Sequence, residues 1–205
     1  RFLVIGDGPS RDDFHGLARD SGVEKGDRVL EIGPGAGTLT RALLDRGCQV
    51  TTMELDGLLC QYLKDRPDLT PLHLIEGDAL ETKNRLSRTL LERLDLDSGA
   101  EGDAGFHLVA NLPYSIAAPL VAMLVAQRSD LKSIGVLVQK EMAMRWVARP
   151  GTREYGTTTV LLALSGEGKI SRTVPAHAFV PPPKVESCFY TWTRAATRPP
   201  IPPAL

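Results

Sequence analysis

The sequence predicts an α/β fold in which helices cover both faces of a doubly wound, Rossmann-like sheet. Short apolar runs typical of buried strands alternate with segments of helical period along most of the chain. A glycine-rich turn joins the first clear strand to the helix that follows it. Two β-rich runs near the end of the chain predict that the sheet closes with an antiparallel strand. We expect residues 1–194 to form this domain and residues 195–205 to form a proline-rich tail.

In the first half of the chain, each expected strand is followed by a helix. A helix over residues 12–21 comes before them, with Phe14, Leu17 and Ala18 on one face and Gly22 at its end. The expected strands are residues 27–32, 49–54 and 71–76, and the expected helices are residues 38–46, 56–66 and 81–94. Pro67 ends the helix over residues 56–66, because proline cannot continue the hydrogen-bond ladder.

An acidic, glycine-rich loop over residues 95–105 leads into the second half of the chain. Strands are expected over residues 106–110 and 133–139, and helices over residues 115–126 and 141–148. Residues 157–164 and 187–193 are β-rich and predict the closing strands. The segment 180–185 between them is proline-rich and is expected to be a surface loop, because proline cannot donate a hydrogen bond in a central strand.

The composition fits an ordinary globular domain. Of 205 residues, 42% are hydrophobic and 24% are charged, and no apolar run reaches the ~20 residues of a membrane span. We therefore expect no membrane segment, no signal peptide and a cytoplasmic location. The formal charge of −1 and the pI of about 6.5 do not indicate the strongly basic surface of many nucleic-acid binders.

The cysteines and histidines do not indicate a metal site. The cysteines are far apart and lack a C-x-x-C pair, which argues against a disulfide framework and against zinc. The histidines are scattered without the spacing of metal ligands. These residues are Cys48, Cys60, Cys188, His15, His73, His107 and His177. We expect no bound metal.

The glycine-rich turn runs from Glu31 to Gly37 with the pattern E-x-G-x-G-x-G. Glycines at such a strand-to-helix turn let a ligand approach the backbone closely. A dinucleotide-binding fingerprint requires glycine or alanine after Gly35 at the place that Thr38 occupies, so the turn departs from that fingerprint. The turn alone leaves a ligand site and a purely structural role both open.

Two acidic residues come at the ends of the next two expected strands. Glu54 ends the second strand, where a carboxylate can accept hydrogen bonds from both hydroxyl groups of a ribose. Asp78 follows the third strand and can accept a hydrogen bond from an adenine amine. A helix-capping or solvated acid is the alternative for each of them.

Asn111-Leu112-Pro113-Tyr114 follows the fourth expected strand, at the edge where open α/β sheets bind ligands. The Asn111 carboxamide oxygen can accept a hydrogen bond from an amine without carrying charge. Pro113 has no N–H group, so its carbonyl and that of Leu112 can face a ligand, and the Tyr114 ring can stack on a base. These groups would orient the lone pair of an adenine N6 amine toward an electrophilic methyl group. The alternative is a loop that only turns the chain.

Four basic residues, Lys140, Arg145, Arg149 and Arg153, recur within 14 positions. They form either a local nucleic-acid-binding surface or a solvated helix face, and the spacing does not decide between the two.

The glycine turn, Glu54, Asp78 and the Asn111 corner occur in an order that resembles the rRNA adenine N6,N6-dimethyltransferases of the KsgA type and the related Erm methyltransferases. The resemblance covers nearly the whole chain and includes three further segments. These are Gln139-Lys140-Glu141, the stretch from Arg149-Pro150-Gly151 to Tyr155-Gly156, and Phe179-Val180-Pro181-Pro182-Pro183-Lys184-Val185-Glu186-Ser187. The resemblance implies a class I methyltransferase fold.

The resemblance also implies which residues form the site. It implies S-adenosyl-L-methionine as the cofactor, bound by Gly33, Gly35, Glu54, Asp78 and Asn111, with Leu3 as a weaker candidate. It implies that Asn111, Leu112, Pro113 and Tyr114 hold the target adenine. Phe179 would close the other face of a base that is flipped out of its stack.

The sequence departs from the family pattern in three places. Arg1 occupies the place of a family asparagine, and the loop before Phe106 is longer than usual. The family carries a basic helical domain after its final strand, and we expect this chain to be without that domain.

The resemblance implies dimethylation of adenine N6 in small-subunit rRNA by a monomeric enzyme whose partner is ribosomal RNA, within the small-subunit particle. Two alternatives stay open. One is a large-subunit rRNA adenine methyltransferase of the Erm type. The other is a non-catalytic RNA-binding or ribosome-assembly factor that retains the fold, which the near-neutral charge favours.

Overall fold

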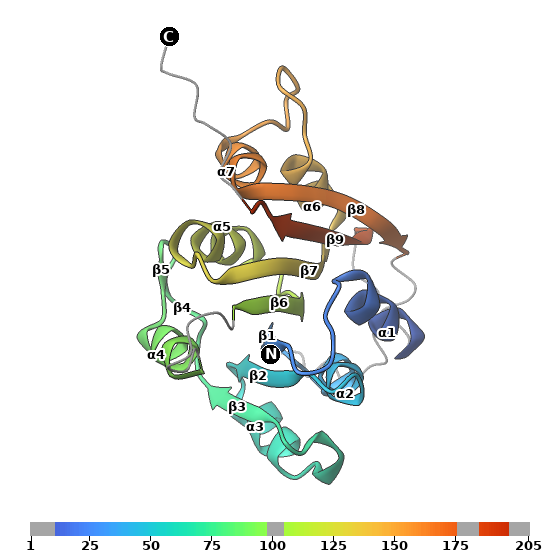
Figure 1. The fold of residues 1–205 in the computed structure, drawn as a ribbon, viewed down its shortest axis with the longest axis vertical. Coiled ribbons are helices and arrows are strands. Elements are labelled where there is room, and N and C mark those ends of the chain that lie inside the picture. Colours follow the sequence, from blue (N-terminus) through green and yellow to red (C-terminus); the bar gives the residue numbers. More distant parts are fainter. Residues whose placement is uncertain (1–10, 98–104, 176–184, 197–205) are drawn as a thin grey trace.

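The structure is a computed structural model that describes residues 11–97, 105–175 and 185–196. A seven-stranded sheet forms its centre, with the strand order β3-β2-β1-β6-β7-β9-β8 (Figure 1). The first five strands in this order are parallel, whereas β9 runs antiparallel to both of its neighbours. The predicted α/β fold with an antiparallel C-terminal strand is therefore confirmed.

The elements follow one another in chain order. The strands of the large sheet are β1 (Arg28–Ile32), β2 (Gln49–Glu54), β3 (His73–Glu76), β6 (Phe106–Asn111), β7 (Leu131–Gln139), β8 (Gly166–Val174) and β9 (Ser187–Arg194). Two short strands, β4 (Leu80–Thr82) and β5 (Arg85–Leu86), pair with each other. The helices are α1 (Arg11–Asp20), α2 (Thr38–Asp45), α3 (Gly57–Lys64), α4 (Arg88–Asp97), α5 (Ala117–Gln127), α6 (Lys140–Trp146) and α7 (Thr157–Ser165), with a 3-10 turn at Pro67–Leu69.

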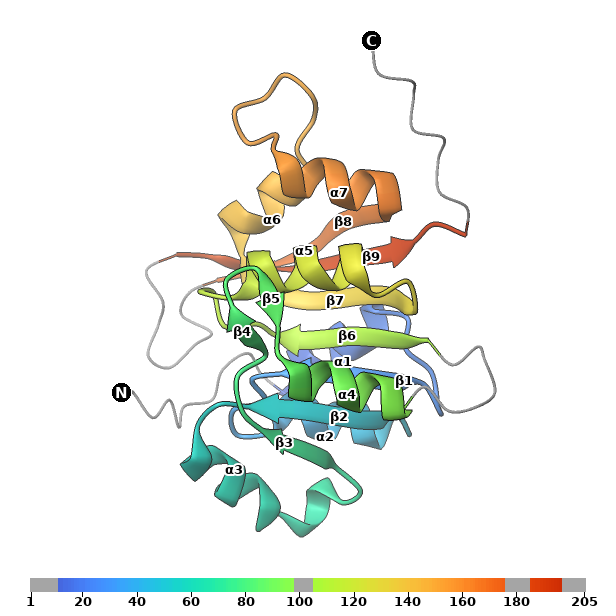
Figure 2. The ribbon, with the colours of Figure 1, turned by 90° about the vertical axis from the view of Figure 1, so that its left-hand side faces the viewer.

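Helices cover both faces of the sheet (Figures 1 and 2). α1 and α2 pack on one face, and α4 and α5 pack on the other, where α6 and α7 extend the layer toward β9. Neighbouring residues of a strand enter different cores, as Val29 and Leu30 do in β1. The Trp192 indole of β9 donates a hydrogen bond to the Leu162 carbonyl of α7 at 3.0 Å. Because helices cover both faces, β1 and β2 bury residues on both sides, and these include polar ones such as Glu31 and Thr52.

Most predicted elements agree with the structure to within two residues at each boundary. This agreement covers the strands predicted over residues 27–32, 49–54, 71–76, 106–110, 133–139 and 187–193. It also covers the helices predicted over residues 12–21, 38–46, 56–66, 115–126 and 141–148. Phe14, Leu17 and Ala18 are buried on one face of α1 as expected.

The helix predicted over residues 81–94 is wrong in its first half. The chain forms the β4–β5 hairpin there, and the Thr82 hydroxyl accepts a hydrogen bond from the Asn84 N–H group at 3.3 Å in its turn. α4 starts only at Arg88, after the Ser87 hydroxyl accepts a hydrogen bond from the Leu90 N–H group at 3.2 Å. This capping contact sets the helix start, and the apolar spacing alone does not reveal it.

The strand predicted over residues 157–164 is also wrong, because the segment forms helix α7. Its threonines and consecutive apolar residues favour a strand locally, but a short apolar run does not distinguish a buried helix from a buried strand. At the start of α7, the Thr159 hydroxyl accepts a hydrogen bond from the Gly156 N–H group and donates one to the Arg145 carbonyl, at 3.1 and 2.6 Å. Packing against α5 and β9 then stabilises the helix.

Strand β8 was not predicted at all. Its sequence is rich in glycine and charged residues, and most of its side chains are partly or fully exposed, as expected for a strand at the edge of a sheet. Gly166 and Gly168 make room for aromatic side chains of β9. A Cβ atom on Gly168 would lie 2.1 Å from the Tyr190 hydroxyl, and one on Gly166 would lie 2.6 Å from the Trp192 ring.

Several expectations concern residues outside the described ranges. The described ranges leave out residues 1–10 and 197–205. The boundary between the domain at 1–194 and the tail at 195–205 therefore stays a prediction. The expected loop over residues 95–105 is described only at its ends, where α4 continues to Asp97. Within the described ranges, none of the helices combines the length and the apolar character of a membrane-spanning segment.

Candidate functional site

The carboxyl ends of β2, β1 and β6 lie side by side at one edge of the sheet (Figure 2). The chain builds the sheet outward from β1 to β3 and then returns to place β6 on the other side of β1. The strand order therefore reverses between β1 and β6, and open α/β sheets bind their ligands at such a point. The glycine-rich turn follows β1 and Asn111 ends β6, so the two motifs flank this point.

The backbone of the glycine-rich turn adopts conformations that favour glycine. Gly33, Gly35 and Gly37 have φ angles of 69°, 56° and 81°. A Cβ atom placed on Gly33 would lie 3.1 Å from the Pro113 side chain, whereas one on Gly35 would have no neighbouring atom within 4 Å. The turn therefore lies next to the Asn111 corner at Gly33 and presents open backbone at Gly35.

The corner after β6 has a fixed backbone. Asn111 is half-buried, and the N–H group of the buried Leu112 donates a hydrogen bond to the backbone of β7 at 3.2 Å. The Pro113 carbonyl accepts hydrogen bonds from the N–H groups of Ile116 and Ala117, both at 3.1 Å. The expectation that the Pro113 carbonyl faces a ligand is therefore wrong, because this carbonyl holds the start of α5.

The Tyr114 ring is tied to the last strand of the sheet. Its hydroxyl lies 2.7 Å from the hydroxyl of Ser187, the first residue of β9, whose side chain is fully buried. This contact restricts the ring to one orientation beside Asn111. Tyr114 itself is half-buried.

Glu54 ends β2 and is 7% exposed. Its Oε1 atom accepts a hydrogen bond from the Asp56 N–H group at 3.0 Å, and Asp56 in turn caps α3 by accepting one from Leu58 at 2.8 Å. This local order holds the Glu54 carboxylate at the sheet edge. The next side chain, Leu55, is 68% exposed.

Asp78 follows β3, and one of its carboxylate oxygens accepts a hydrogen bond from the Leu80 N–H group at 2.9 Å. This contact holds the turn into β4. Asp78 remains exposed, so the capping contact and a contact with a ligand are compatible.

Residues 15–200 match the family model of ribosomal RNA adenine dimethylases. The chain belongs to the ribosomal RNA adenine dimethylase family.

Individual relatives agree with this family. Ribosomal RNA small subunit methyltransferase A of Clostridium botulinum is 39% identical over 166 residues, which make up 80% of this chain and 56% of that protein. A dimethyladenosine transferase from Plasmodium falciparum has a similar structure, with a TM-score of 0.74 and 27% identity over 91% of this chain and 62% of that chain. The 23S rRNA methyltransferase ErmE, at 24% identity and a TM-score of 0.69 over 92% of this chain and 70% of its own, shares the fold. This dimethylase chain thus spans a little over half the length of the curated relatives it matches.

Glu31 is a buried group of this dimethylase domain that the sequence analysis used only as the first position of the glycine pattern. It is 1% exposed, and its Oε2 atom accepts a hydrogen bond from the Thr40 hydroxyl at 2.6 Å. Burial raises the pKa of Glu31 from 4.5 to about 8, and the nearby Glu54 charge acts in the same direction, while the Thr40 hydrogen bond opposes both. The sequence signal for this residue was the acid at the first position of the glycine pattern.

Two expected site residues of the dimethylase family, Leu3 and Phe179, lie outside the described residues. The same holds for the proline run from Pro181 to Pro183. The roles expected for these residues stay predictions.

The four basic residues near the end of β7 do not form one helix face. Lys140 pairs with Glu186 and Arg145 pairs with Glu141, at 2.8 and 2.7 Å. α6 ends at Trp146, so Arg149 and Arg153 lie on the loop that follows it. The interpretation as a solvated helix face therefore applies only to Lys140 and Arg145.

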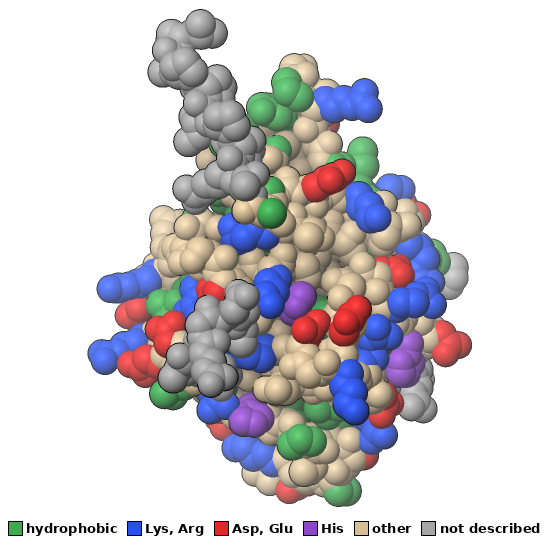
Figure 3. Space-filling view, in the orientation of Figure 1, with side chains coloured by type: hydrophobic (Ala, Val, Ile, Leu, Met, Phe, Trp, Pro, Cys, Tyr) green, Lys and Arg blue, Asp and Glu red, His purple; other side chains and the backbone are tan. Residues whose placement is uncertain are grey.

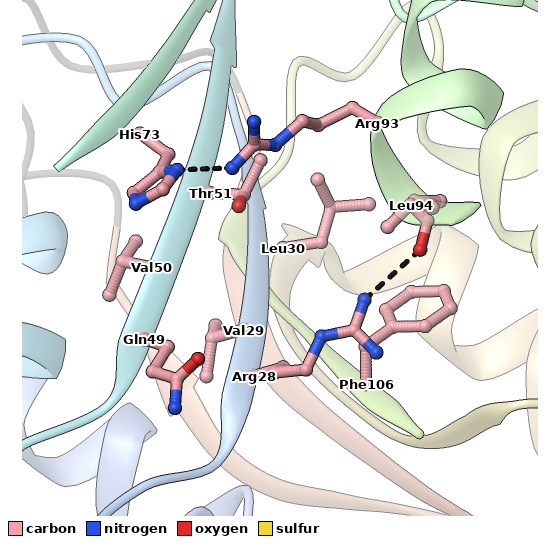
Figure 4. A pocket seen from close by; sticks show the side chains of 10 residues that line it. All are labelled: Arg28, Val29, Leu30, Gln49, Val50, Thr51, His73, Arg93, Leu94 and Phe106. Carbon is pink, nitrogen blue, oxygen red and sulfur yellow. Dashed lines mark hydrogen bonds between the residues drawn. The ribbon is translucent and has the colours of Figure 1, made fainter. Parts of the chain in front are cut away.

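A cavity of about 80 Å³ lies at the opposite, amino edge of the sheet (Figure 4). Arg28 donates a hydrogen bond to the Leu94 carbonyl at 3.1 Å on one side of it, and Arg93 contacts the ring of His73 on the other. These contacts connect α4 to the sheet. The cavity is too small for a nucleoside and is far from the glycine turn and the Asn111 corner.

Charges of both signs are intermingled on the face of the molecule seen in Figure 3. This pattern agrees with the formal charge of −1. In the described ranges, no group of three or more His, Cys, Asp or Glu side chains could hold a metal ion, and Cys48, Cys60 and Cys188 are free and buried.

Proposed function

We propose that this chain carries the catalytic domain of an S-adenosyl-L-methionine-dependent enzyme that dimethylates N6 of adenine in small-subunit ribosomal RNA. The closeness of Gly33 to Pro113 carries the proposal, because it brings a turn suited to a cofactor next to a corner suited to an amine. Family membership supports the reaction, and the name of the Clostridium botulinum relative supports the small subunit over the large one. A cytoplasmic location and a monomeric state stay predictions.

The residues at the carboxyl edge fit S-adenosyl-L-methionine. The glycine turn, with Gly33 next to Pro113 and open backbone at Gly35, can accommodate the amino-acid part of the cofactor, and Glu54 can accept hydrogen bonds from both ribose hydroxyl groups. Asp78 can accept one from the adenine amine, and the exposed Leu55 side chain can pack on the adenine ring. Leu3 is a further candidate. The bound cofactor supplies a methyl group on a positively charged sulfur.

The corner after β6 can make an unreactive amine attack that methyl group. The lone pair of adenine N6 is delocalised into the ring, so acceptors for its N–H groups are needed to aim it. The Asn111 carboxamide oxygen is one acceptor, and the Leu112 carbonyl is the second candidate now that the Pro113 carbonyl is committed to α5. No ionised base is required, because the methylated ammonium loses its proton to water.

Two aromatic rings would hold the adenine during the reaction. The Tyr114 ring can stack on one face of the base, which in single-strand binders contributes about 1–3 kcal/mol per base. Phe179 is the candidate for the other face. In the second transfer the amine has only one N–H group, so the Asn111 acceptor must suffice.

Methyl transfer from tritiated S-adenosyl-L-methionine to unmodified small-subunit particles tests the proposal, with large-subunit particles as the control. We expect label in the small-subunit rRNA, at a position that primer extension then maps. Label only in large-subunit rRNA would instead support the Erm-type alternative. RNA binding without any transfer would support the non-catalytic factor.

A further inference from the structure

A groove of about 790 Å³ lies between α6, α7 and the start of α5. Its volume falls in the ~300–1,000 Å³ range of ligand-binding pockets. Its lining combines arginines, an exposed tyrosine, threonine hydroxyls and apolar side chains, from Ala118, Gln139, Glu141, Met142, Arg145, Trp146, Arg153, Glu154, Tyr155, Gly156, Thr157, Thr158 and Thr159. None of these residues belongs to the site described above.

The groove opens directly beside the Asn111 corner. Its wall includes Gln139, the last residue of β7, and β7 pairs with β6 so that Leu137 lies opposite Asn111. Its other wall includes Ala118 in the first turn of α5, which the Pro113 carbonyl holds. Figure 2 shows α6 and the loop after it on the side of the sheet toward which β2 and β6 point. A strand of RNA that places one base at Asn111 would therefore continue into this groove.

The loop between α6 and α7 presents its side chains from an ordered backbone. The Thr152 N–H group donates to the Arg149 carbonyl, and the Tyr155 N–H group donates to the Thr152 carbonyl, both at 3.2 Å. Tyr155 is 38% exposed. Within the described ranges no ion pair involves Arg149 or Arg153, and both are exposed, so each can pair with a phosphate.

The charges in the groove favour a single nucleotide over a polyphosphate. Arg145 and Arg153 are balanced by Glu141 and Glu154, and Arg145 is already paired with Glu141 at 2.7 Å. A ligand with several negative charges would meet no net positive charge here. One phosphate per base matches one available arginine, and an exposed aromatic ring beside an arginine is the usual arrangement for binding single-stranded nucleic acid.

We propose that this groove binds the nucleotide next to the target adenine in the same RNA strand, with its base on the Tyr155 ring and its phosphate on Arg153. The inference rests on the proposed function and extends it to the substrate. A base can be extruded only if its neighbours in the strand are held, so a subsite beside Asn111 would contribute to the affinity for RNA and not to the chemical step.

The test compares the parent chain with its variants in their affinity for a short, fluorescently labelled single-stranded oligoribonucleotide that contains one adenine. The affinity is measured by anisotropy over a series of salt concentrations. We expect Tyr155→Ala to weaken binding roughly tenfold and Tyr155→Phe to bind like the parent chain, because the ring is retained. Arg153→Ala should weaken binding and reduce the salt slope by about 0.7, the value for one phosphate of a single strand. The control is Arg88→Ala on α4, whose side chain is 86% exposed and remote from the groove.

Steady-state methyl transfer separates this inference from the proposed function. Both groove variants should raise KM for RNA and leave kcat within about twofold of the parent value, since the groove lies outside the reacting site. If the parent chain transfers methyl groups and both variants match it in affinity, salt slope and KM, the groove assignment is overturned and the function stands. If the parent chain transfers none, the function fails, and the affinity comparison still decides whether the groove binds RNA.

Discussion

The hydroxyl groups of Tyr114 and Ser187 lie 2.7 Å apart, although the two residues are separated by 73 positions in the chain. This hydrogen bond connects the corner that follows β6 to the first residue of β9. The ring proposed to carry the target base is thus oriented by the strand that closes the sheet.

Removing either hydroxyl group should loosen the Tyr114 ring. We expect Tyr114→Phe and Ser187→Ala each to lower kcat/KM for rRNA roughly fivefold, because a hydrogen bond of about 1 kcal/mol is lost in both. The double variant should lose little more, since both changes remove the same bond. Losses that multiply in the double variant would show that the two hydroxyl groups act independently.

The closeness of the glycine turn to the corner can be tested with a matched pair of glycine variants. Gly33→Ala places a Cβ atom 3.1 Å from Pro113 at a φ of 69°, whereas Gly22→Ala has a φ of 74° and no atom within 4 Å. Both variants should lose about 1–2 kcal/mol of stability through backbone strain. Beyond this shared loss, only Gly33→Ala should lose further stability, measured by urea unfolding. Only Gly33→Ala should also weaken cofactor binding, measured by calorimetry. Equal losses in the two variants would contradict the importance of this closeness.

The buried carboxyl group of Glu31 predicts a dependence of stability on pH. Burial raises its pKa from 4.5 to about 8, so the folded protein retains a proton that the unfolded chain releases in this interval. The free energy of unfolding therefore falls by up to about 1.4 kcal/mol per pH unit as the pH rises through it. Glu31→Gln removes this effect, so the stability of the variant relative to the parent should increase from about pH 5 to about pH 8. A difference that is constant with pH in urea unfolding would argue against a raised pKa.

Glu54 should contribute to cofactor binding through its charge. Glu54→Ala is expected to weaken the binding of S-adenosyl-L-methionine roughly 10- to 100-fold in calorimetry, because hydrogen bonds to a charged group contribute about 1.5–3 kcal/mol. Glu92→Ala on α4 removes an acid that is 57% exposed and remote from the sheet edge, and it serves as the control. An unchanged affinity in the Glu54 variant would remove this residue from the cofactor site.

The strand-end residues of the site could be predicted from the sequence, because the carboxyl ends of parallel strands meet at one edge of the sheet. Glu54 and Asn111 both occupy such ends. The bond between Tyr114 and Ser187 could not be predicted, because it depends on the antiparallel register in which Ser187 pairs with Gln139. The sequence carries no local signal for that register.

The errors in the fold have a similar origin. The apolar residues of α7 are compatible with either a helix or a buried strand, and only packing against α5 and Trp192 decides between them. The glycines of β8 suggest a loop until their aromatic partners on β9 are known. Tertiary contacts therefore determined the elements that local sequence preferences did not.

The central claim is that an uncharged amide beside the glycine turn makes the target amine reactive. Methyl transfer to rRNA by Asn111→Ala, measured together with cofactor affinity, tests it most directly. We expect transfer to fall roughly 100-fold or more while cofactor affinity falls only modestly, and Asn111→Asp to be impaired less than the alanine variant. Full methyl transfer by Asn111→Ala would contradict the account.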